Sequence, residues 1–288
     1  MGSIVGSQTL SILLITAASA VVLIFIFLVG ISVFQERIAF QPQGPPYAVP
    51  RDSRRVDYLA ADGQPLFAYL VGDPEKSDGL VLVFHGNADM AARQVEWSGE
   101  LSSRTGLAVM IAEYRGYAGL SGKPTYASSQ FDADAAYEFA IGQLRVSADR
   151  IAYFGHSLGT AIAAELASRH RPFALVLQSP FTSARDMARM ITGRRPGAFS
   201  WNALSRIHFD TIEKVKTSDV PVSVVHGNRD RLIPSSMGQE VFQAAQTKGQ
   251  WLLVPAASHN DVSIHGGEEY WQWITRALSP PARMSVPQ

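Results

Sequence analysis

The chain has 288 residues, and its 25 basic and 25 acidic side chains give a formal net charge of zero. This balance excludes the excess positive charge that a nucleic-acid partner requires. The absence of cysteine excludes disulfides, thiolate metal sites and cysteine nucleophiles, while the 47% hydrophobic content is enough for a sizeable core.

The first informative segment is an uncharged, apolar run over residues 10–34. A helix needs roughly 20 such residues to cross a bilayer, so we predict a transmembrane helix there, after an N-terminal tail at 1–9. A cleaved signal peptide is the alternative, because Ala-Ser-Ala at 18–20 resembles a cleavage site. No basic residue precedes the run, however, and it exceeds the usual hydrophobic region of about 7–15 residues. Arg37 follows the run and favours a cytoplasmic position for the rest of the chain.

Proline and glycine mark the next segment. Gln-Pro-Gln-Gly-Pro-Pro at residues 41–46 cannot form a helix or a central strand, so we interpret residues 35–53 as a short, stiff spacer. One globular domain without internal repeats is expected at 54–278. Residues 279–288 contain three prolines and are predicted to be a frayed tail.

Short apolar runs alternate with helix-length segments along the domain. The continuous apolar run at residues 80–84 is typical of a strand that is buried on both faces. This alternation predicts an α/β fold with a mostly parallel sheet and helices on both faces, while Asp-Gly at 62–63 predicts an antiparallel hairpin at the sheet edge. The predicted strands are 55–59, 65–72, 80–84, 107–112, 151–154, 174–177, 220–225 and 251–254, and the predicted helices are 90–103, 130–145, 158–170, 235–246 and 268–278.

Gly-His-Ser-Leu-Gly at residues 155–159 is the main candidate for chemistry. It directly follows the predicted strand 151–154 and precedes an alanine-rich helical segment. Such an abrupt turn raises the Ser157 hydroxyl above the sheet, and a Cβ on either glycine would collide with a neighbouring strand or helix. We therefore predict Ser157 as a nucleophile. The alternative is an ordinary glycine-rich turn with a capping serine.

A serine nucleophile needs a base, and the base needs an acid that orients it. Asp230 lies in the loop after the strand 220–225, and His259 lies in the loop after the strand 251–254. Both therefore fall at the carboxyl ends of their strands, which is the sheet edge where Ser157 is expected. We predict Asp230 as the acid and His259 as the base.

Other residues compete for these two roles. His265 is the rival base, and Asp261 is the rival acid although it is close in sequence to His259. Asp219 precedes its strand and falls at the wrong edge of the sheet. Other histidines are expected to pack locally or to support loops, namely His85, His156 and His226.

His-Gly-Asn-Ala at residues 85–88 follows the most hydrophobic strand. A loop at this place can supply one backbone N–H to an oxyanion, and the residue after the nucleophile can supply another. We predict the N–H groups of Asn87 and Leu158 as these donors, with Ala88 as the alternative to Asn87. A simple turn without this role is the other interpretation.

Taken together, several motifs make residues 50–280 resemble the α/β-hydrolase family, and most closely a membrane-anchored branch with depalmitoylase-like serine hydrolases. The resemblance implies esterase or thioesterase activity on acyl substrates, without a metal or organic cofactor. The sequence Ala-Gly-Leu-Ser at 118–121 departs from the expected Gly-x-Ser, and the cysteine cluster of palmitoylated depalmitoylases is absent, so membrane attachment relies on the helix. The motifs are Phe-His-Gly-Asn-Ala at 84–88, Tyr-Arg-Gly-Tyr at 114–117, the serine motif at 155–159, Ser-Pro-Phe-Thr-Ser at 179–183 and His-Gly-Asn-Arg-Asp at 226–230.

The segment 181–216 contains apolar side chains that could line an acyl pocket, and packing of these side chains on the sheet is the alternative. Because the predicted anchor holds the domain near headgroups, a lipid or a lipidated protein is a candidate substrate. A peptidase with the same three residues and a catalytically inactive, membrane-tethered binding protein are the competing functions. The apolar side chains are Met187, Met190, Ile191, Phe199, Trp201 and Leu204.

Overall fold

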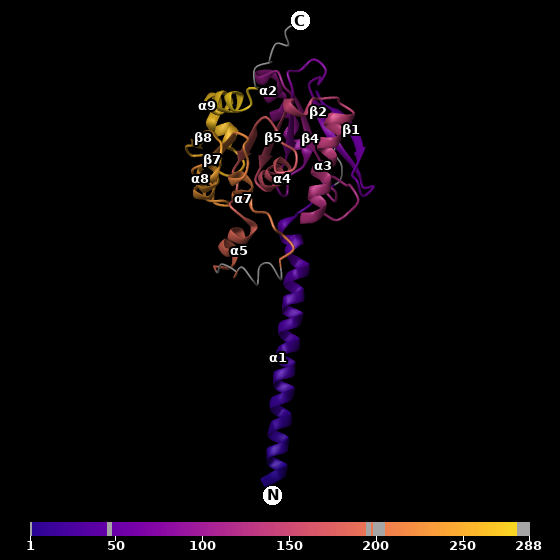
Figure 1. The fold of residues 1–288 in the computed structure, drawn as a ribbon, viewed down its shortest axis with the longest axis vertical. Coiled ribbons are helices and arrows are strands. Elements are labelled where there is room, and N and C mark those ends of the chain that lie inside the picture. The colour runs from indigo at the N-terminus through magenta and orange to yellow at the C-terminus, as the bar shows by residue number, and fades with distance from the viewer. Residues whose placement is uncertain (1, 45–47, 194–196, 198–204, 281–288) are drawn as a thin grey trace.

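A computed structural model describes residues 2–44, 48–193, 197 and 205–280, and in the N-terminal helix it describes the side chains of 14–27, 29–30 and 34–39. The long helix α1 (Gly2–Ala39) leads into a rounded α/β domain (Figure 1). The strands are β1 (Arg54–Leu59), β2 (Pro65–Val71), β3 (Leu80–Phe84), β4 (Ala108–Ala112), β5 (Ile151–His156), β6 (Leu175–Gln178), β7 (Val222–Gly227) and β8 (Lys248–Val254). The other helices are α2 (Val95–Thr105), α3 (Tyr126–Gly142), α4 (Leu158–Ala167), α5 (Ala184–Thr192), α7 (Thr211–Lys216), α8 (Ser235–Ala244) and α9 (Val262–Ala277), with 3₁₀ turns η1 (Ala91–Gln94) and η2 (Ala148–Arg150).

The eight strands form one sheet in the order β1-β2-β4-β3-β5-β6-β7-β8. The hairpin β1–β2 and the pair β2–β4 are antiparallel, and all later neighbours are parallel. The predicted mostly parallel sheet with an antiparallel hairpin at its edge is therefore confirmed. The carboxyl ends of β5, β7 and β8 lie along the same edge, which brings the loops after them together.

Helices cover both faces of the sheet, as predicted. Leu80, Leu82 and Phe84 of β3 belong to a core shared with α3, α4, α7 and α8. Val81 and Val83 belong to the opposite core, which α2 and α9 close. Burying each of these side chains contributes about 1.5–3 kcal/mol, so a strand covered on both faces gains from an unbroken apolar run.

Several helix boundaries differ from the prediction. The segment predicted to begin a helix at residue 90 forms the 3₁₀ turn η1 first, and α2 begins at Val95. Helix α3 begins at Tyr126 instead of residue 130, because Thr125 accepts a hydrogen bond from the N–H of Ser128 while the Ser128 side chain accepts one from Thr125. Helix α9 begins earlier than predicted and is kinked at Gly267, where φ is 49°.

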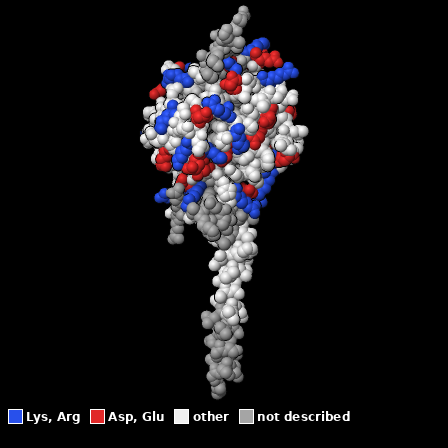
Figure 2. All heavy atoms as spheres, viewed as in Figure 1, with Lys and Arg blue, Asp and Glu red and all other residues white. Residues whose placement is uncertain are grey.

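Helix α1 extends beyond the predicted bounds at both ends, since residues 2–9 and 35–39 are also helical. Large apolar side chains between Val21 and Phe27 are 55–66% exposed, and Figure 2 shows the described middle of this helix without charged side chains, whereas charges of both signs cover the domain. Within the part of the chain that the structure describes, no helix combines the length and apolar character that crossing a bilayer requires. The predicted transmembrane span at 10–34 is therefore not supported.

The first part of the predicted stiff spacer, residues 35–44, is docked on the domain. Phe40 is 3% exposed, and its ring centroid lies 6.4 Å from that of Phe209. The carboxylate of Glu36 forms a 2.7 Å ion pair with Lys123. Residues 35–39 form the end of α1, and the buried Phe40 side chain fixes the residues that follow it on the domain, a contact that the predicted stiff spacer did not include.

Candidate active site

Ser157 occupies a strained turn between β5 and α4. Its backbone has φ 53° and ψ −116°, a region that non-glycine residues adopt only when the surrounding structure enforces it. A Cβ on Gly155 would overlap the backbone of Gly159, and a Cβ on Gly159 would overlap the carbonyl oxygen of Phe84. The predicted need for both glycines is therefore confirmed, because α4 approaches β3 and β5 too closely for a side chain.

The structure brings Ser157, His259 and Asp230 together in one chain of hydrogen bonds. Ser157 Oγ lies 2.8 Å from His259 Nε2, and His259 Nδ1 lies 2.7 Å from Asp230 Oδ2. A neutral imidazole satisfies both contacts when Nδ1–H donates to the carboxylate and Nε2 accepts from the serine hydroxyl. The three residues are only 8–9% exposed, so the group is shielded from bulk water.

Asp230 is held as a carboxylate by four donors. Its Oδ1 accepts from the N–H groups of Leu232 at 2.9 Å and Ile233 at 2.8 Å. Its Oδ2 accepts from His259 and lies 3.2 Å from His226 Nε2. Burial acts to raise the pKa of Asp230, but the hydrogen bonds from His226 and His259 outweigh burial and hold the pKa well below its usual range. Asp230 is therefore charged at neutral pH.

His226 contacts the catalytic-site carboxylate of Asp230, which its position at the end of a strand did not predict. Its Nε2–H donates to the carbonyl of Ile233 at 2.9 Å, and this fixes the tautomer beside Asp230. The other ring nitrogen, Nδ1, is buried without a hydrogen-bond partner among the described residues, and it faces Gly238 so closely that a Cβ there would overlap it. His226 thus supports the carboxylate from the side opposite His259.

The rival residues lie elsewhere. The carboxylate of Asp261 accepts from the N–H of Ser258 at 2.6 Å and from its hydroxyl at 2.7 Å, so it braces the loop that carries His259. His265 lies 3.6 Å from Asp261 and its side chain is 44% exposed. His156 donates to the carbonyl of His259 at 3.2 Å, and burial, together with the proximity of His259, lowers its pKa to about 4.

The loop after β3 lies directly against the nucleophile, since a Cβ on Gly86 would stand 3.4 Å from Ser157 Cβ. His85 Nδ1 donates to the carbonyl of Gly86 at 2.9 Å, and His85 Nε2 donates to Glu113 at 2.8 Å. The protonated ring, which carries two N–H groups, satisfies both contacts. Burial alone would lower the pKa of His85, but the Glu113 carboxylate raises it above its ordinary value.

This arrangement constrains the direction of the Asn87 N–H. The carbonyl of Gly86 and the N–H of Asn87 belong to one trans peptide and point in opposite directions. The Gly86 carbonyl points toward the His85 ring, with which it forms a hydrogen bond, so the N–H of Asn87 points away from His85. Leu158 is the first residue of α4, so its N–H has no partner within the helix. The roles of Asn87 and Leu158 as oxyanion donors stay a prediction. The sequence did not reveal Glu113, which lies 28 residues from His85.

The segment predicted as an acyl pocket is described in part. Phe181 is buried, Met187 packs on the core, and Met190 and Ile191 of α5 are 41% and 71% exposed. The remaining apolar candidates, Phe199, Trp201 and Leu204, lie outside the described residues.

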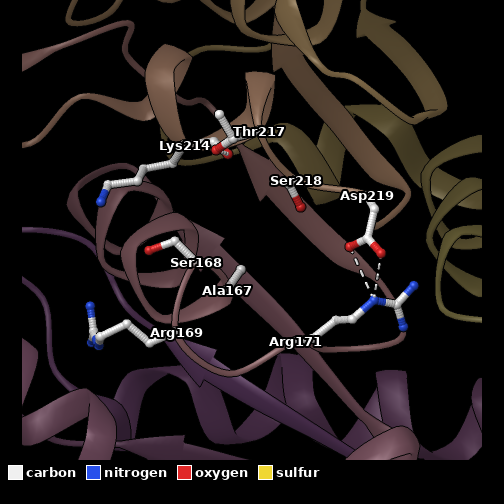
Figure 3. A pocket seen from close by; sticks show the side chains of 8 residues that line it. All are labelled: Ala167, Ser168, Arg169, Arg171, Lys214, Thr217, Ser218 and Asp219. Atoms are coloured by element: carbon white, nitrogen blue, oxygen red, sulfur yellow. Dashed lines mark hydrogen bonds and ion pairs between the residues drawn. The ribbon is translucent and has the colours of Figure 1, made fainter.

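A separate cavity of about 210 Å³ is lined in part by Ala167 and Ser168, at the end of α4 opposite Ser157. Figure 3 shows the side chains that line it. Its cations already have anionic partners, since Arg171 pairs with Asp219 at 3.0 Å and Lys214 pairs with Glu165 at 2.8 Å. Nothing in its lining links it to the serine. Across the described residues, no cluster of three or more His, Asp or Glu side chains is arranged to hold a metal ion.

Comparisons with known proteins agree with the fold. Residues 75–208 match the Hydrolase_4 family model, which is described as serine aminopeptidase, S33. The chain is 33% identical over 258 residues to the uncharacterized protein Rv2307c of Mycobacterium tuberculosis, covering 86% of this chain and 88% of that protein. It is 30% identical over 200 residues to the human alpha/beta hydrolase domain-containing protein 17B, covering 69% of this chain and 67% of that protein. The Pyrococcus furiosus esterase Pf2001 superposes with a TM-score of 0.64 at 19% identity, covering 83% of this chain and 97% of that structure.

Proposed function

The chain belongs to the α/β-hydrolase family as a serine hydrolase of the esterase type, and we propose that it cleaves acyl ester or thioester bonds through Ser157, His259 and Asp230. The observation that carries the proposal is the continuous set of contacts from Ser157 Oγ through the His259 ring to Asp230, at 2.8 and 2.7 Å. The strained backbone of Ser157 supports it, because such strain clusters at catalytic positions.

In the first step, Ser157 Oγ attacks the acyl carbonyl carbon while His259 Nε2 takes the hydroxyl proton. The imidazolium that forms is stabilised by the carboxylate of Asp230, whose low pKa keeps it charged. His259 then gives the proton to the leaving alcohol or thiol, and the acyl group stays on Ser157 as an ester. A water molecule repeats the sequence in reverse and releases the acid.

Negative charge develops on the substrate oxygen in both steps. We propose that the N–H groups of Asn87 and Leu158 bind this oxygen. The contact between Gly86 and Ser157 and the direction imposed by His85 support this role for Asn87. Loss of one such donor typically lowers the rate by about 10²–10³.

Hydrolysis of a series of p-nitrophenyl esters and matched thioesters, from two to eight acyl carbons, tests the proposal. We expect kcat/KM to rise with acyl length by up to about tenfold for every two methylenes that are fully buried. Ser157→Ala should abolish turnover, while Ser168→Ala at the far end of α4 serves as the matched control. A flat profile, or a sharp preference for acetyl, would argue against an acyl-binding pocket.

A peptidase is the second candidate, because the matching family model is described as serine aminopeptidase. An aminopeptidase needs an anionic group that binds the substrate's free amino terminus. In the described site, Asp230 is fully engaged by its four donors, and Asp261 is engaged by Ser258. Amino-acyl p-nitroanilides are therefore expected to be poorer substrates than acyl esters, and faster turnover of the anilides would favour the peptidase.

We also propose that the apolar part of α1 attaches the protein to a membrane, so that acyl chains of lipids or lipidated proteins are within reach. The exposure of every large apolar side chain between Val21 and Phe27 supports this, since such a surface is unfavourable in water. A cytoplasmic position of the domain stays a prediction from Arg37.

Alkaline carbonate extraction of the full chain tests the attachment, and the protein is expected in the membrane pellet. A chain that begins at Gln35 is expected in the supernatant with its esterase activity retained. Recovery of the full chain in the supernatant would contradict the proposal, and an N-terminus near residue 21 would indicate a cleaved signal peptide.

A further inference from the structure

We propose that residues 35–43, the strap that follows the exposed part of α1, belong to the active site, because they hold the Asn87 side chain and with it the loop that carries the oxyanion-binding N–H. The inference rests on the proposed function, since it assigns positioning residues to the same reaction. It also links α1 directly to the catalytic loop.

The Asn87 side chain is the point where three parts of the chain meet. Its Oδ1 accepts hydrogen bonds from the Gln41 N–H at 2.7 Å, the Tyr117 hydroxyl at 2.9 Å and the Ala88 N–H at 3.0 Å. The first two donors lie 46 and 30 residues away along the chain. An amide oxygen has two lone pairs, so three donors occupy its full acceptor capacity and leave it little freedom to move.

The strap is also attached to the domain at other points, so the residues that contact Asn87 are themselves held in place. Phe40 is buried in the core beside Phe209. The carbonyl of Gln43 accepts from the N–H of Ala118 at 3.0 Å, in the loop that also contains Tyr117. At the other end, the side-chain oxygen of Gln35 accepts from the backbone N–H of Arg206 at 2.8 Å.

The loop after β3 needs such support. Ala88 has φ 54°, a left-handed conformation that is unfavourable for a residue with a Cβ. His85 holds the Gly86 carbonyl on one side of Asn87, and the strap and Tyr117 hold the Asn87 side chain on the other. A shift of about 1 Å in a positioned group can cost roughly 100-fold in rate, so a loosened loop weakens oxyanion binding without removing any catalytic group.

Gln41→Pro in the full-length protein, purified in detergent, is the direct test, because proline has no N–H to donate. We expect kcat to fall about fivefold, the equivalent of one typical hydrogen bond, with KM nearly unchanged. The Ki of an alkyl trifluoromethyl ketone should rise by the same factor, because its adduct with serine places an oxyanion in the same position. Gln41→Ala keeps the N–H and is expected to restore most of kcat and Ki.

Tyr117→Phe removes the second long-range donor and should have the same signature, and combining it with Gln41→Pro should lower kcat further. If Gln41→Pro does not fold, kcat and Ki of Tyr117→Phe test the inference by themselves. Wild-type kcat and Ki in both single variants would overturn the inference, as would equal losses in Gln41→Pro and Gln41→Ala. Wild-type protein that neither hydrolyses acyl esters nor binds the ketone would instead overturn the proposed function.

Discussion

Asp230→Asn replaces a carboxylate by an amide of nearly the same shape and leaves the loop otherwise unchanged. In the wild type, Oδ1 faces the N–H groups of Leu232 and Ile233, and Oδ2 faces the ring N–H groups of His259 and His226. All four partners are donors. Whichever way the asparagine side chain is turned, its NH₂ group faces two donors. The two hydrogen bonds that the replaced oxygen accepted are therefore lost.

The effect on catalysis follows from the tautomer of His259. With the asparagine oxygen on the two backbone N–H groups, its NH₂ faces His259 Nδ1, which must then lose its proton to accept. The proton moves to Nε2, which can no longer take the proton of Ser157. The comparable change in a well-studied serine protease costs about 10⁴ in kcat, and we expect a loss of that order here.

The assay is kcat for a p-nitrophenyl ester at pH 7, with thermal unfolding to verify that the variant is folded. Asp261→Asn is the matched control, because Asp261 contacts Ser258 and His265 instead of His259. It is expected to lose less than tenfold. A loss below tenfold in Asp230→Asn, or a larger loss in Asp261→Asn, would refute the assignment of the acid.

Two further predictions concern stability. Glu113→Gln leaves the buried His85 imidazolium unpaired and should lower the free energy of unfolding by about 3–5 kcal/mol in urea titrations. The pKa of His85 is raised in the folded state, so this loss should be largest below the ordinary histidine pKa of about 6.5. The loss should shrink as the pH rises through the raised pKa of the folded protein. A loss that does not change with pH would contradict a charged pair between His85 and Glu113. Gly159→Ala should prevent accumulation of folded protein, because its Cβ would overlap the backbone of Phe84. Gly99→Ala in α2 is the control: a Cβ there meets no atom within 4 Å, and the change should stabilise the fold by up to about 1 kcal/mol. Normal folding of Gly159→Ala would count against the close approach of α4 to β3.

Parts of the fold were predictable because the physical signal is local. The unbroken apolar run at residues 80–84 reflects a strand buried on both faces, and the glycines around Ser157 reflect two close backbone approaches. The positions of Asp230 and His259 followed from chain order, because loops at the carboxyl ends of parallel strands share one edge.

The rest depended on contacts between distant residues, which leave no local pattern. Glu113 carries no sign of its pairing with His85, and Phe40 adjoins a proline-rich segment that indicates a stiff spacer but gives no sign of a buried contact. The start of α3 was missed for a different reason: the capping pair Thr125 and Ser128 uses serine where glutamate or glutamine is the more recognisable signal.

Labelling with a fluorophosphonate probe tests the central claim most directly, because the probe reacts with a serine only when a neighbouring base activates it. Peptide mass spectrometry of the labelled protein is expected to place the phosphonate on Ser157 alone, and Ser157→Ala and Asp230→Asn should block or greatly slow the labelling. Absence of labelling in folded wild-type protein, or a phosphonate on another serine, would contradict the account.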